Sequence, residues 1–147
     1  MKKVYTCFCT DVIHEGHLNI LEKANAYGDV YVGVLSDAAM VRYNRFPTIS
    51  LEKRMEIVKE TGLVKEVMIQ EDIMYDQIME KLRPDYVVHG DNWAKGPEAV
   101  IRKNVIDNLE KFGGELIEVP YTYNENVRRI DEQMKEKLVM PEFRRKR

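Results

Sequence analysis

The sequence is poor in cysteine, and it has neither a long hydrophobic run nor an excess of charge of one sign. Its only two cysteines, Cys7 and Cys9, are two positions apart in one strand-like run. A disulfide between such close neighbours along a strand is geometrically awkward, so free thiols and a reducing cytoplasm are expected. No apolar stretch is long enough to span a bilayer and no signal-peptide pattern follows Met1, so no membrane partner is expected.

The charges nearly balance, since 23 Lys and Arg residues against 25 Asp and Glu residues give a formal net charge of −2. No global positive field draws the chain to nucleic acid, and no nucleic-acid partner is expected. The one basic cluster, residues 144–147, is typical of a solvated tail. The 44% of hydrophobic residues is ordinary for a globular protein and provides for one core.

Apolar, β-branched runs alternate with helical patterns along most of the chain. The expected strands are 4–8, 30–35, 66–69, 86–89 and 115–119, and the expected helices are 17–26, 51–59, 75–82 and 98–112. Ser50 suits a helix N-cap, and Pro84 ends the third of these helices. The alternation predicts an α/β fold, a Rossmann-like open parallel five-stranded sheet with helices on both faces.

Three polar segments follow expected strands, at residues 14–17, 89–93 and 121–126. Ligands of open parallel sheets bind beyond the carboxyl ends of the strands, so these segments are expected at one edge. After residue 126 a charged helical pattern leads into the basic end. We expect a core domain over 1–126, followed by a C-terminal helix and tail over 127–147. The tail either packs on the domain or begins a linker to a second domain.

The most informative motif is the pair His14 and His17, which flank Gly16 where the first strand gives way to the first helix. Backbone N–H groups at a helix start attract phosphate. The histidines add donors that can become cationic near neutral pH, and Gly16 lets a ligand approach the backbone. The motif therefore predicts a nucleotide triphosphate site, at which the α-phosphorus is attacked and pyrophosphate leaves.

A zinc site is the alternative, because Cys7, Cys9, His14 and His17 carry zinc-type ligand atoms. Their spacing matches no zinc pattern, and a metal-binding histidine pair on a helix usually has the spacing i, i+4. The phosphate site is therefore favoured.

Several motifs resemble the HxGH cytidylyltransferase family, specifically its glycerol-3-phosphate type. They are residues 11–17, 43–47 leading to 52–54, 88–93, and 113–122. The resemblance covers nearly the whole chain and extends to the cytidylyltransferase domain that precedes phosphoenolpyruvate mutase in enzymes of phosphonate biosynthesis. Residues 140–145 are similar to the junction ahead of the mutase. The resemblance implies the nucleotidylyltransferase fold.

By this resemblance, His14 and His17 are catalytic residues that contact the triphosphate and stabilise the transition state. The nucleotide-binding residues that it implies are Cys9, Thr10, Gly16, His89, Gly90, Asp91, Trp93, Thr122 and Asn126. It implies that Arg45 and Arg54 bind the second substrate. The residues alone leave other roles open: Trp93 as a core anchor, and Arg54 as a solvated arginine on a helix face.

The chain departs from the family pattern in three places. Asn92 replaces a usual aspartate, and the loop after the second strand offers Arg42 or Arg45 in place of a lysine. The last motif usually ends in Ser or Thr residues, whereas here it reads Tyr-Asn-Glu-Asn-Val-Arg-Arg over 123–129. Asn126 can still cap a helix, but Glu125 would oppose phosphates. These departures leave open a nucleotide-binding module that has lost turnover.

The resemblance implies transfer of CMP from CTP, accompanied by Mg²⁺, to a small phosphonate or phosphate. The favoured acceptor is similar to 2-hydroxyethylphosphonate, and glycerol 3-phosphate is the alternative. No metal held by protein side chains is expected. The resemblance further implies a homodimer, and it leaves open a native fusion to a phosphoenolpyruvate mutase domain.

Overall fold

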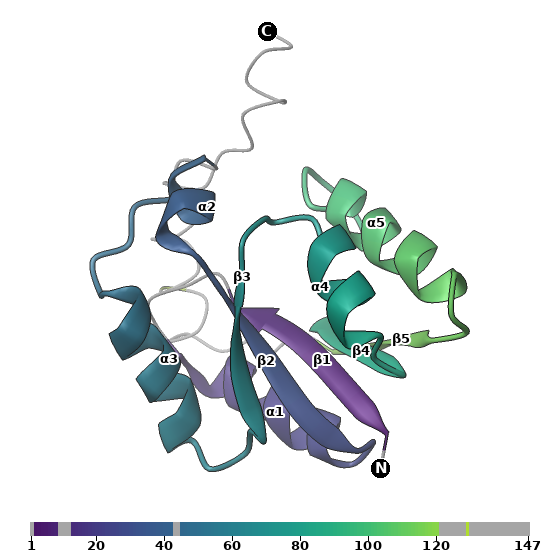
Figure 1. The fold of residues 1–147 in the computed structure, drawn as a ribbon, viewed down its shortest axis with the longest axis horizontal. Helices are drawn as coiled ribbons and strands as arrows, with labels where there is room; N and C mark the ends of the chain where they lie inside the picture. The colour runs from purple at the N-terminus through teal and green to yellow at the C-terminus, as the bar shows by residue number, and fades with distance from the viewer. Residues whose placement is uncertain (1, 9–12, 43–44, 121–128, 130–147) are drawn as a thin grey trace, which may run out of the picture.

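The computed structural model describes residues 2–8, 13–42, 45–120 and 129. Its elements are β1 (Lys3–Phe8), α1 (Glu15–Asn25), β2 (Asp29–Leu35), α2 (Asp37–Arg42), α3 (Leu51–Glu60), β3 (Glu66–Gln70), α4 (Asp76–Leu82), β4 (Tyr86–Gly90), α5 (Ala99–Glu110) and β5 (Glu115–Val119). The strands form one parallel sheet in the order β3-β2-β1-β4-β5 (Figure 1). Within these residues, no helix is long and apolar enough to cross a membrane.

The predicted α/β sheet is confirmed, with each of the five strands within one residue of its expected bounds. The four predicted helices are also present, with ends displaced by up to two residues. Helix α2 was not among the predicted helices, because its six residues carry no full apolar period. This helix starts after Ser36, whose hydroxyl accepts the N–H of Ala39 at 3.1 Å.

The order of the strands reverses at β1. The chain runs outwards from β1 through β2 to β3, then crosses to β4 on the other side of β1 and ends at β5. Open α/β sheets bind their ligands at the carboxyl ends of the strands beside such a switch point. Because α1 follows β1, its N-terminus lies at this switch point.

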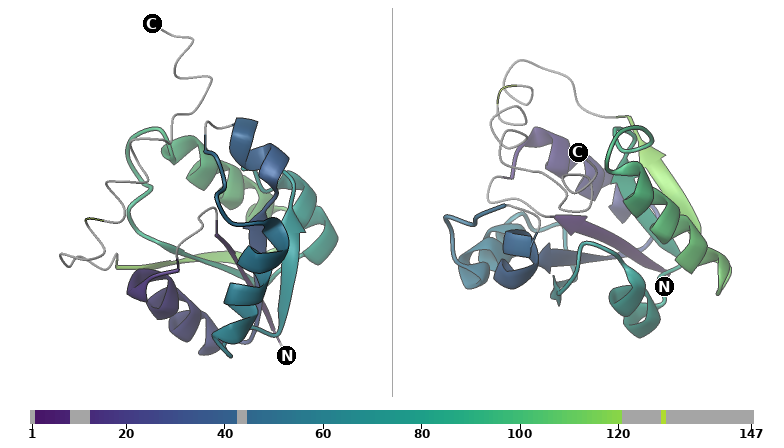
Figure 2. Two further views of the ribbon diagram at one scale, coloured as in Figure 1. Left: turned by 90° about the vertical axis from the view of Figure 1, so that its left-hand side faces the viewer. Right: turned by 90° about the horizontal axis from the view of Figure 1, so that it is seen from above.

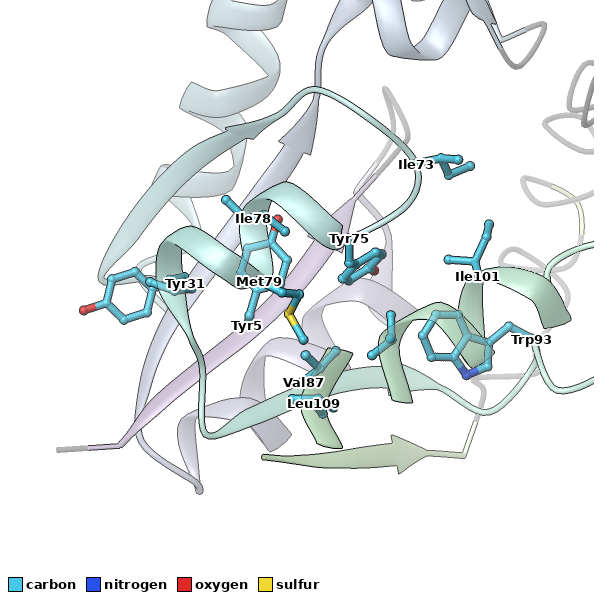
Figure 3. Packing of buried hydrophobic residues seen from close by; sticks show 12 residues of the cluster. Tyr5, Tyr31, Ile73, Tyr75, Ile78, Met79, Val87, Trp93, Ile101 and Leu109 are labelled. Atoms are coloured by element: carbon cyan, nitrogen blue, oxygen red, sulfur yellow. The ribbon is translucent and has the colours of Figure 1, made fainter. Parts of the chain in front are cut away.

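Each face of the sheet has its own core, since successive strand residues point to opposite faces. On one face, Val4 and Val32 belong to a buried cluster with Leu21 of α1 and Val58 of α3. On the other face, a cluster around Tyr5 includes residues of α4 and α5 (Figure 3). Figure 2 shows helices on both sides of the sheet.

Tyr5 links three strands. Its buried ring crosses Gly33 of β2, and its hydroxyl donates to Oε1 of Gln70 on β3 at 2.6 Å. A Cβ atom on Gly33 would lie 1.7 Å from the Tyr5 hydroxyl oxygen, so only glycine leaves room for this ring. Burial raises the pKa of Tyr5 well above its ordinary value, and the neighbouring Cys7 raises it further. The hydroxyl therefore remains a donor at neutral pH.

Candidate functional site

His14 and His17 close the start of α1 through hydrogen bonds with the backbone. His14 is the N-cap residue, and its Nδ1 accepts the N–H of Gly16 at 3.0 Å. His17 lies three residues further on, and its Nδ1 accepts the N–H of His14 at 3.1 Å. The pair forms a capping box, with imidazoles in the places usually taken by Ser or Thr and by Glu or Gln.

These two hydrogen bonds fix the tautomers of the rings. A ring nitrogen that accepts a hydrogen bond cannot carry the proton, so each neutral ring holds its proton on Nε2. The centroids of the two rings are 4.2 Å apart. Two Nε2–H donors therefore lie close together at the N-terminus of α1, where the helix dipole also favours an anion.

His17 is neutral at pH 7 in the free protein. Burial, together with smaller contributions from the charges of His14, His89 and Arg45, lowers its pKa to about 3. The expectation that these imidazoles can become cationic near neutral pH therefore does not hold for His17 in the free protein. In this state His17 serves as a neutral donor, and the negative charge of a bound triphosphate would oppose the shift.

Two of the predicted segments lie at the same edge of the sheet. β1 and β4 are neighbouring parallel strands, so the start of α1, which follows β1, and His89 at the end of β4 share this edge. The expectation that segments 14–17 and 89–93 share one edge is thus confirmed. Arg45 is only 8% exposed, and its backbone N–H donates to the carbonyl of Met40 at 2.9 Å. Segment 121–126 lies outside the described residues.

Two arginines were candidates to replace the family's lysine. The guanidinium of Arg42 donates to the carbonyl of Glu71 at 2.6 Å, in the loop after β3. Arg45 instead acts on His17. Of the two, Arg45 is the one whose charge acts on His17, and its contact with a bound anion stays a prediction.

The structure leaves part of the predicted site undescribed. Gly16 is buried in the first turn of α1, and its contact with a nucleotide stays a prediction. Cys9, Thr10, Thr122 and Asn126 lie outside the described residues. The zinc alternative needs Cys9, and within the described ranges no three His, Cys, Asp or Glu side chains are grouped as metal ligands would be. These ranges therefore give no support to a zinc site.

Arg54 is not the solvated arginine of the alternative interpretation. It is 2% exposed, and its guanidinium donates to the carbonyls of Leu35 at 2.7 Å and Ile49 at 3.1 Å. A further N–H group of Arg54 pairs with the carboxylate of Asp37. Arg54 thus joins α3 to the carboxyl end of β2, and its contact with a second substrate stays a prediction.

His89 and Trp93 form a stacked pair, with ring centroids 3.4 Å apart and planes inclined by 3°. The Nδ1 of His89 is 2.8 Å from the carbonyl of Gly90, which can only accept, so Nδ1 carries the proton. This tautomer is the opposite of the one at His14 and His17. Burial lowers the pKa of His89 to about 4, so the ring is neutral at pH 7.

Trp93 is 1% exposed and belongs to the core cluster on the α5 face, with Ile101 nearby (Figure 3). This is the core-anchor role that the sequence left open. Asp91, by contrast, is exposed, and its N–H donates to the carbonyl of Val119 at 2.9 Å. The nucleoside contacts of Gly90, Asp91 and Trp93 stay predictions.

Sequence reasoning missed Glu118 and Arg102. Glu118 of β5 is the register partner of His89 in β4, and its Oε2 accepts the indole N–H of Trp93 at 2.8 Å. Arg102 of α5 donates to both carboxylate oxygens of Glu118, at 3.0 and 2.8 Å. The hydrogen bonds from Arg102 hold the pKa of Glu118 below its usual value. Neither residue belongs to a recognisable motif, so no sequence signal pointed to them.

Among solved structures, the chain is similar to the lipopolysaccharide core biosynthesis protein from Thermoplasma volcanium GSS1. The TM-score is 0.67 at 17% identity, over 85% of this chain and 99% of that chain. It is also similar to pantothenate synthetase from Thermus thermophilus, with a TM-score of 0.61 at 17% identity, over 93% of this chain and 65% of that one. At these identities the likeness concerns the fold alone.

The relatives that are similar in sequence include a bacterial and a plant protein. The chain is 31% identical over 139 residues to the bifunctional protein HldE of Pseudomonas aeruginosa (strain UCBPP-PA14), covering 92% of this chain and 28% of that protein. It is 37% identical over 97 residues to ethanolamine-phosphate cytidylyltransferase of Arabidopsis thaliana, covering 61% of this chain and 23% of that protein. The chain thus spans about a quarter of the length of these relatives. Residues 5–141 match the family described as cytidylyltransferase-like, and the chain belongs to this family.

Proposed function

We propose that the chain transfers CMP from Mg²⁺-bound CTP to a small phosphonate or phosphate and releases pyrophosphate. Its family makes it a nucleotidyltransferase. The observation that carries the proposal is the pair of Nε2–H donors that His14 and His17 present at the N-terminus of α1. The site lies at the switch point of the sheet, where nucleotides bind in related architectures.

In the proposed reaction, an oxygen of the acceptor attacks the α-phosphorus of CTP in line with the leaving group. The new P–O bond forms while the bond from the α-phosphorus to the bridging oxygen breaks, and pyrophosphate leaves with that electron pair. Charge builds on the equatorial oxygens and on the bridging oxygen. The donors of His14 and His17 and the cation of Arg45 stabilise this charge without any covalent bond to the protein.

Mg²⁺ enters this proposal as part of the substrate. The imidazoles at this edge of the sheet present N–H groups, which bind phosphate oxygens, whereas Mg²⁺ prefers oxygen ligands. We therefore assign the coordination of Mg²⁺ to the triphosphate and water, and the coordination of the triphosphate to the histidine pair.

The favoured acceptor is 2-hydroxyethylphosphonate, because the chain resembles the cytidylyltransferase domains that precede phosphoenolpyruvate mutase. Ethanolamine phosphate, in the name of the Arabidopsis relative, also carries a phosphorus oxyanion on a two-carbon chain. Glycerol 3-phosphate is the alternative within the same chemistry.

Residues 127–147 would lead from the core over 1–126 to a mutase domain, and the greater length of the relatives fits such a fusion. The proposed assembly is a homodimer.

A screen of pyrophosphate release tests the proposed reaction. CTP, UTP and ATP are each combined with the three acceptors in the presence of Mg²⁺. We expect release with CTP, fastest with 2-hydroxyethylphosphonate, and no release without an acceptor. Lack of release from every pair would contradict the proposal.

A nucleotide-binding module without turnover is the second candidate function. The observation that favours it is the altered motif over 123–129, which contains Glu125, a carboxylate that would oppose phosphate. Calorimetry separates the two candidates. CTP binding without pyrophosphate release indicates the module, whereas binding together with release indicates the enzyme.

A further inference from the structure

Four side chains from α5, β5 and the end of β4 form one connected series of contacts next to the candidate site. The guanidinium of Arg102 holds the carboxylate of Glu118, which accepts the indole N–H of Trp93, and the indole ring stacks on His89. The series runs from α5 through β5 to the end of β4, which lies at the same edge of the sheet as the start of α1.

We propose that Arg102 and Glu118 are positioning residues of the nucleotide site. Acting through Trp93, they hold the His89 ring so that its Nε2 accepts a hydrogen bond from a hydroxyl or amino group of the bound nucleotide. This inference rests on the proposed function. In it, Arg102 and Glu118 help to determine the affinity of the site for the nucleotide.

The first part of the series fixes the indole. Trp93 is 1% exposed, and a buried indole N–H requires an acceptor. The side chain of Glu118 provides it while remaining 25% exposed, and that of Arg102 is 33% exposed. A two-pronged, charge-assisted contact such as that between Arg102 and Glu118 is strong and directional. The carboxylate, and with it the plane of the indole, is therefore held in place.

The second part fixes His89. The indole covers one face of the imidazole, and the Gly90 carbonyl takes its Nδ1–H. The lone pair therefore lies on Nε2, and no residue in the described part of the chain hydrogen-bonds this atom. Phosphate oxygens are themselves acceptors, so a neutral His89 is matched to a hydroxyl or amino group of the nucleotide.

Substitutions at Glu118 test the positioning role in the full chain. We expect Glu118→Leu to raise the KM for CTP about three- to tenfold, the cost of one neutral hydrogen bond, while kcat stays within about twofold. Glu118→Gln retains an oxygen for the indole N–H and should recover most of the affinity. The matched control is Lys103→Gln on α5, the helix that carries Arg102. It removes an exposed ion pair with Asp107 and should change neither the KM for CTP nor kcat.

A purely structural role predicts a different pattern. Partial unfolding lowers the active fraction, so the apparent kcat falls while the KM for CTP is unchanged. Trp93 is the only tryptophan of the chain, so its emission reports directly on this site. We expect CTP to change the emission of the wild type, with half-saturation about three- to tenfold higher in Glu118→Leu.

If Glu118→Leu does not fold, His89→Phe decides the question, because it keeps an aromatic ring on the indole and removes Nε2. His89→Phe should bind CTP more weakly than the wild type does. The two proteins should bind equally well the analogue that lacks the donor, which is 2′-deoxy-CTP for the 2′-hydroxyl or UTP for the amino group of the base. If the wild type is active but CTP affinity is unchanged in His89→Phe, or in a folded Glu118→Leu, this inference is overturned and the proposed function stands. A wild type that does not bind CTP contradicts the proposed function instead.

Discussion

The backbone N–H of His14 donates to Nδ1 of His17 at 3.1 Å, so the residue that caps α1 is itself held by a residue of the first turn. The same contact that starts the helix also directs the Nε2–H of His17 away from the backbone. One hydrogen bond, from the N–H of His14 to Nδ1 of His17, therefore both stabilises the start of α1 and orients the Nε2–H donor of His17. Substitutions can separate the two effects.

Replacing His14 by Ser should keep the cap and remove the Nε2–H donor. A serine hydroxyl is a good N-cap, so we expect the free energy of unfolding to change by less than about 0.5 kcal/mol. The kcat should fall about 10²- to 10³-fold, as when one donor to a transition state is lost. Urea denaturation and steady-state kinetics of pyrophosphate release measure the two quantities.

A cap elsewhere provides the control. The hydroxyl of Ser50 caps α3 by accepting the N–H of Lys53 at 3.2 Å. Ser50→Ala should lower the free energy of unfolding by about 1 kcal/mol with kcat unchanged. An unchanged kcat in His14→Ser would show that His14 does not stabilise the transition state.

Stability should fall as the pH drops from about 6.5 towards 3. In the unfolded chain a histidine binds its proton near pH 6.5, whereas burial lowers the pKa of His17 to about 3 and that of His89 to about 4. The unfolded state then binds more protons, so each histidine lowers the free energy of unfolding by up to about 1.4 kcal/mol per pH unit within its window. Urea denaturation at several pH values measures this slope.

The double variant His17→Gln/His89→Gln separates this effect from that of the carboxylates. It should have a flatter profile between about pH 6 and 4 than the wild type. Identical slopes in the two proteins would show that these histidines do not titrate differently on folding.

Gly33→Ala should strongly destabilise the fold, because its Cβ would lie 1.7 Å from the Tyr5 hydroxyl oxygen. We expect a loss of about 2 to 3 kcal/mol in the free energy of unfolding. Adding Tyr5→Phe removes the nearest atom, so the double variant should lose less than the sum of the two single losses. Gly62→Ala, with no heavy atom within 4 Å of its Cβ, should cost only the strain of its positive φ, about 1 kcal/mol. Additive losses at Gly33 and Tyr5 would contradict the proposed clash.

Arg54→Met should lower stability in the absence of any substrate. The substitution leaves the carbonyls of Leu35 and Ile49 without their guanidinium donors, at a cost of about 2 to 4 kcal/mol. Thermal and urea denaturation of the free protein measure the loss. A variant with wild-type stability and a raised KM for the acceptor would instead assign Arg54 to substrate binding alone.

Much of the fold could be predicted because its strands are continuous apolar runs bounded by turn residues, as at Val30 to Leu35. The candidate site was predicted from His14 and His17, whose spacing is local and equals that of a capping box. Contacts over long separations could not be predicted. Trp93 and Glu118 are 25 residues apart and meet only because β4 and β5 are neighbours in the sheet.

Histidine tautomers measured by ¹⁵N NMR test the central claim most directly, because the chain has only three histidines. At pH 7 the account predicts Nε2–H tautomers for His14 and His17 and the Nδ1–H tautomer for His89. Addition of Mg²⁺ and CTP should shift the Nε2 signals of His14 and His17 as these atoms donate to phosphate. Nδ1–H tautomers at this pair, or Nε2 signals that do not respond to saturating CTP, would contradict the account.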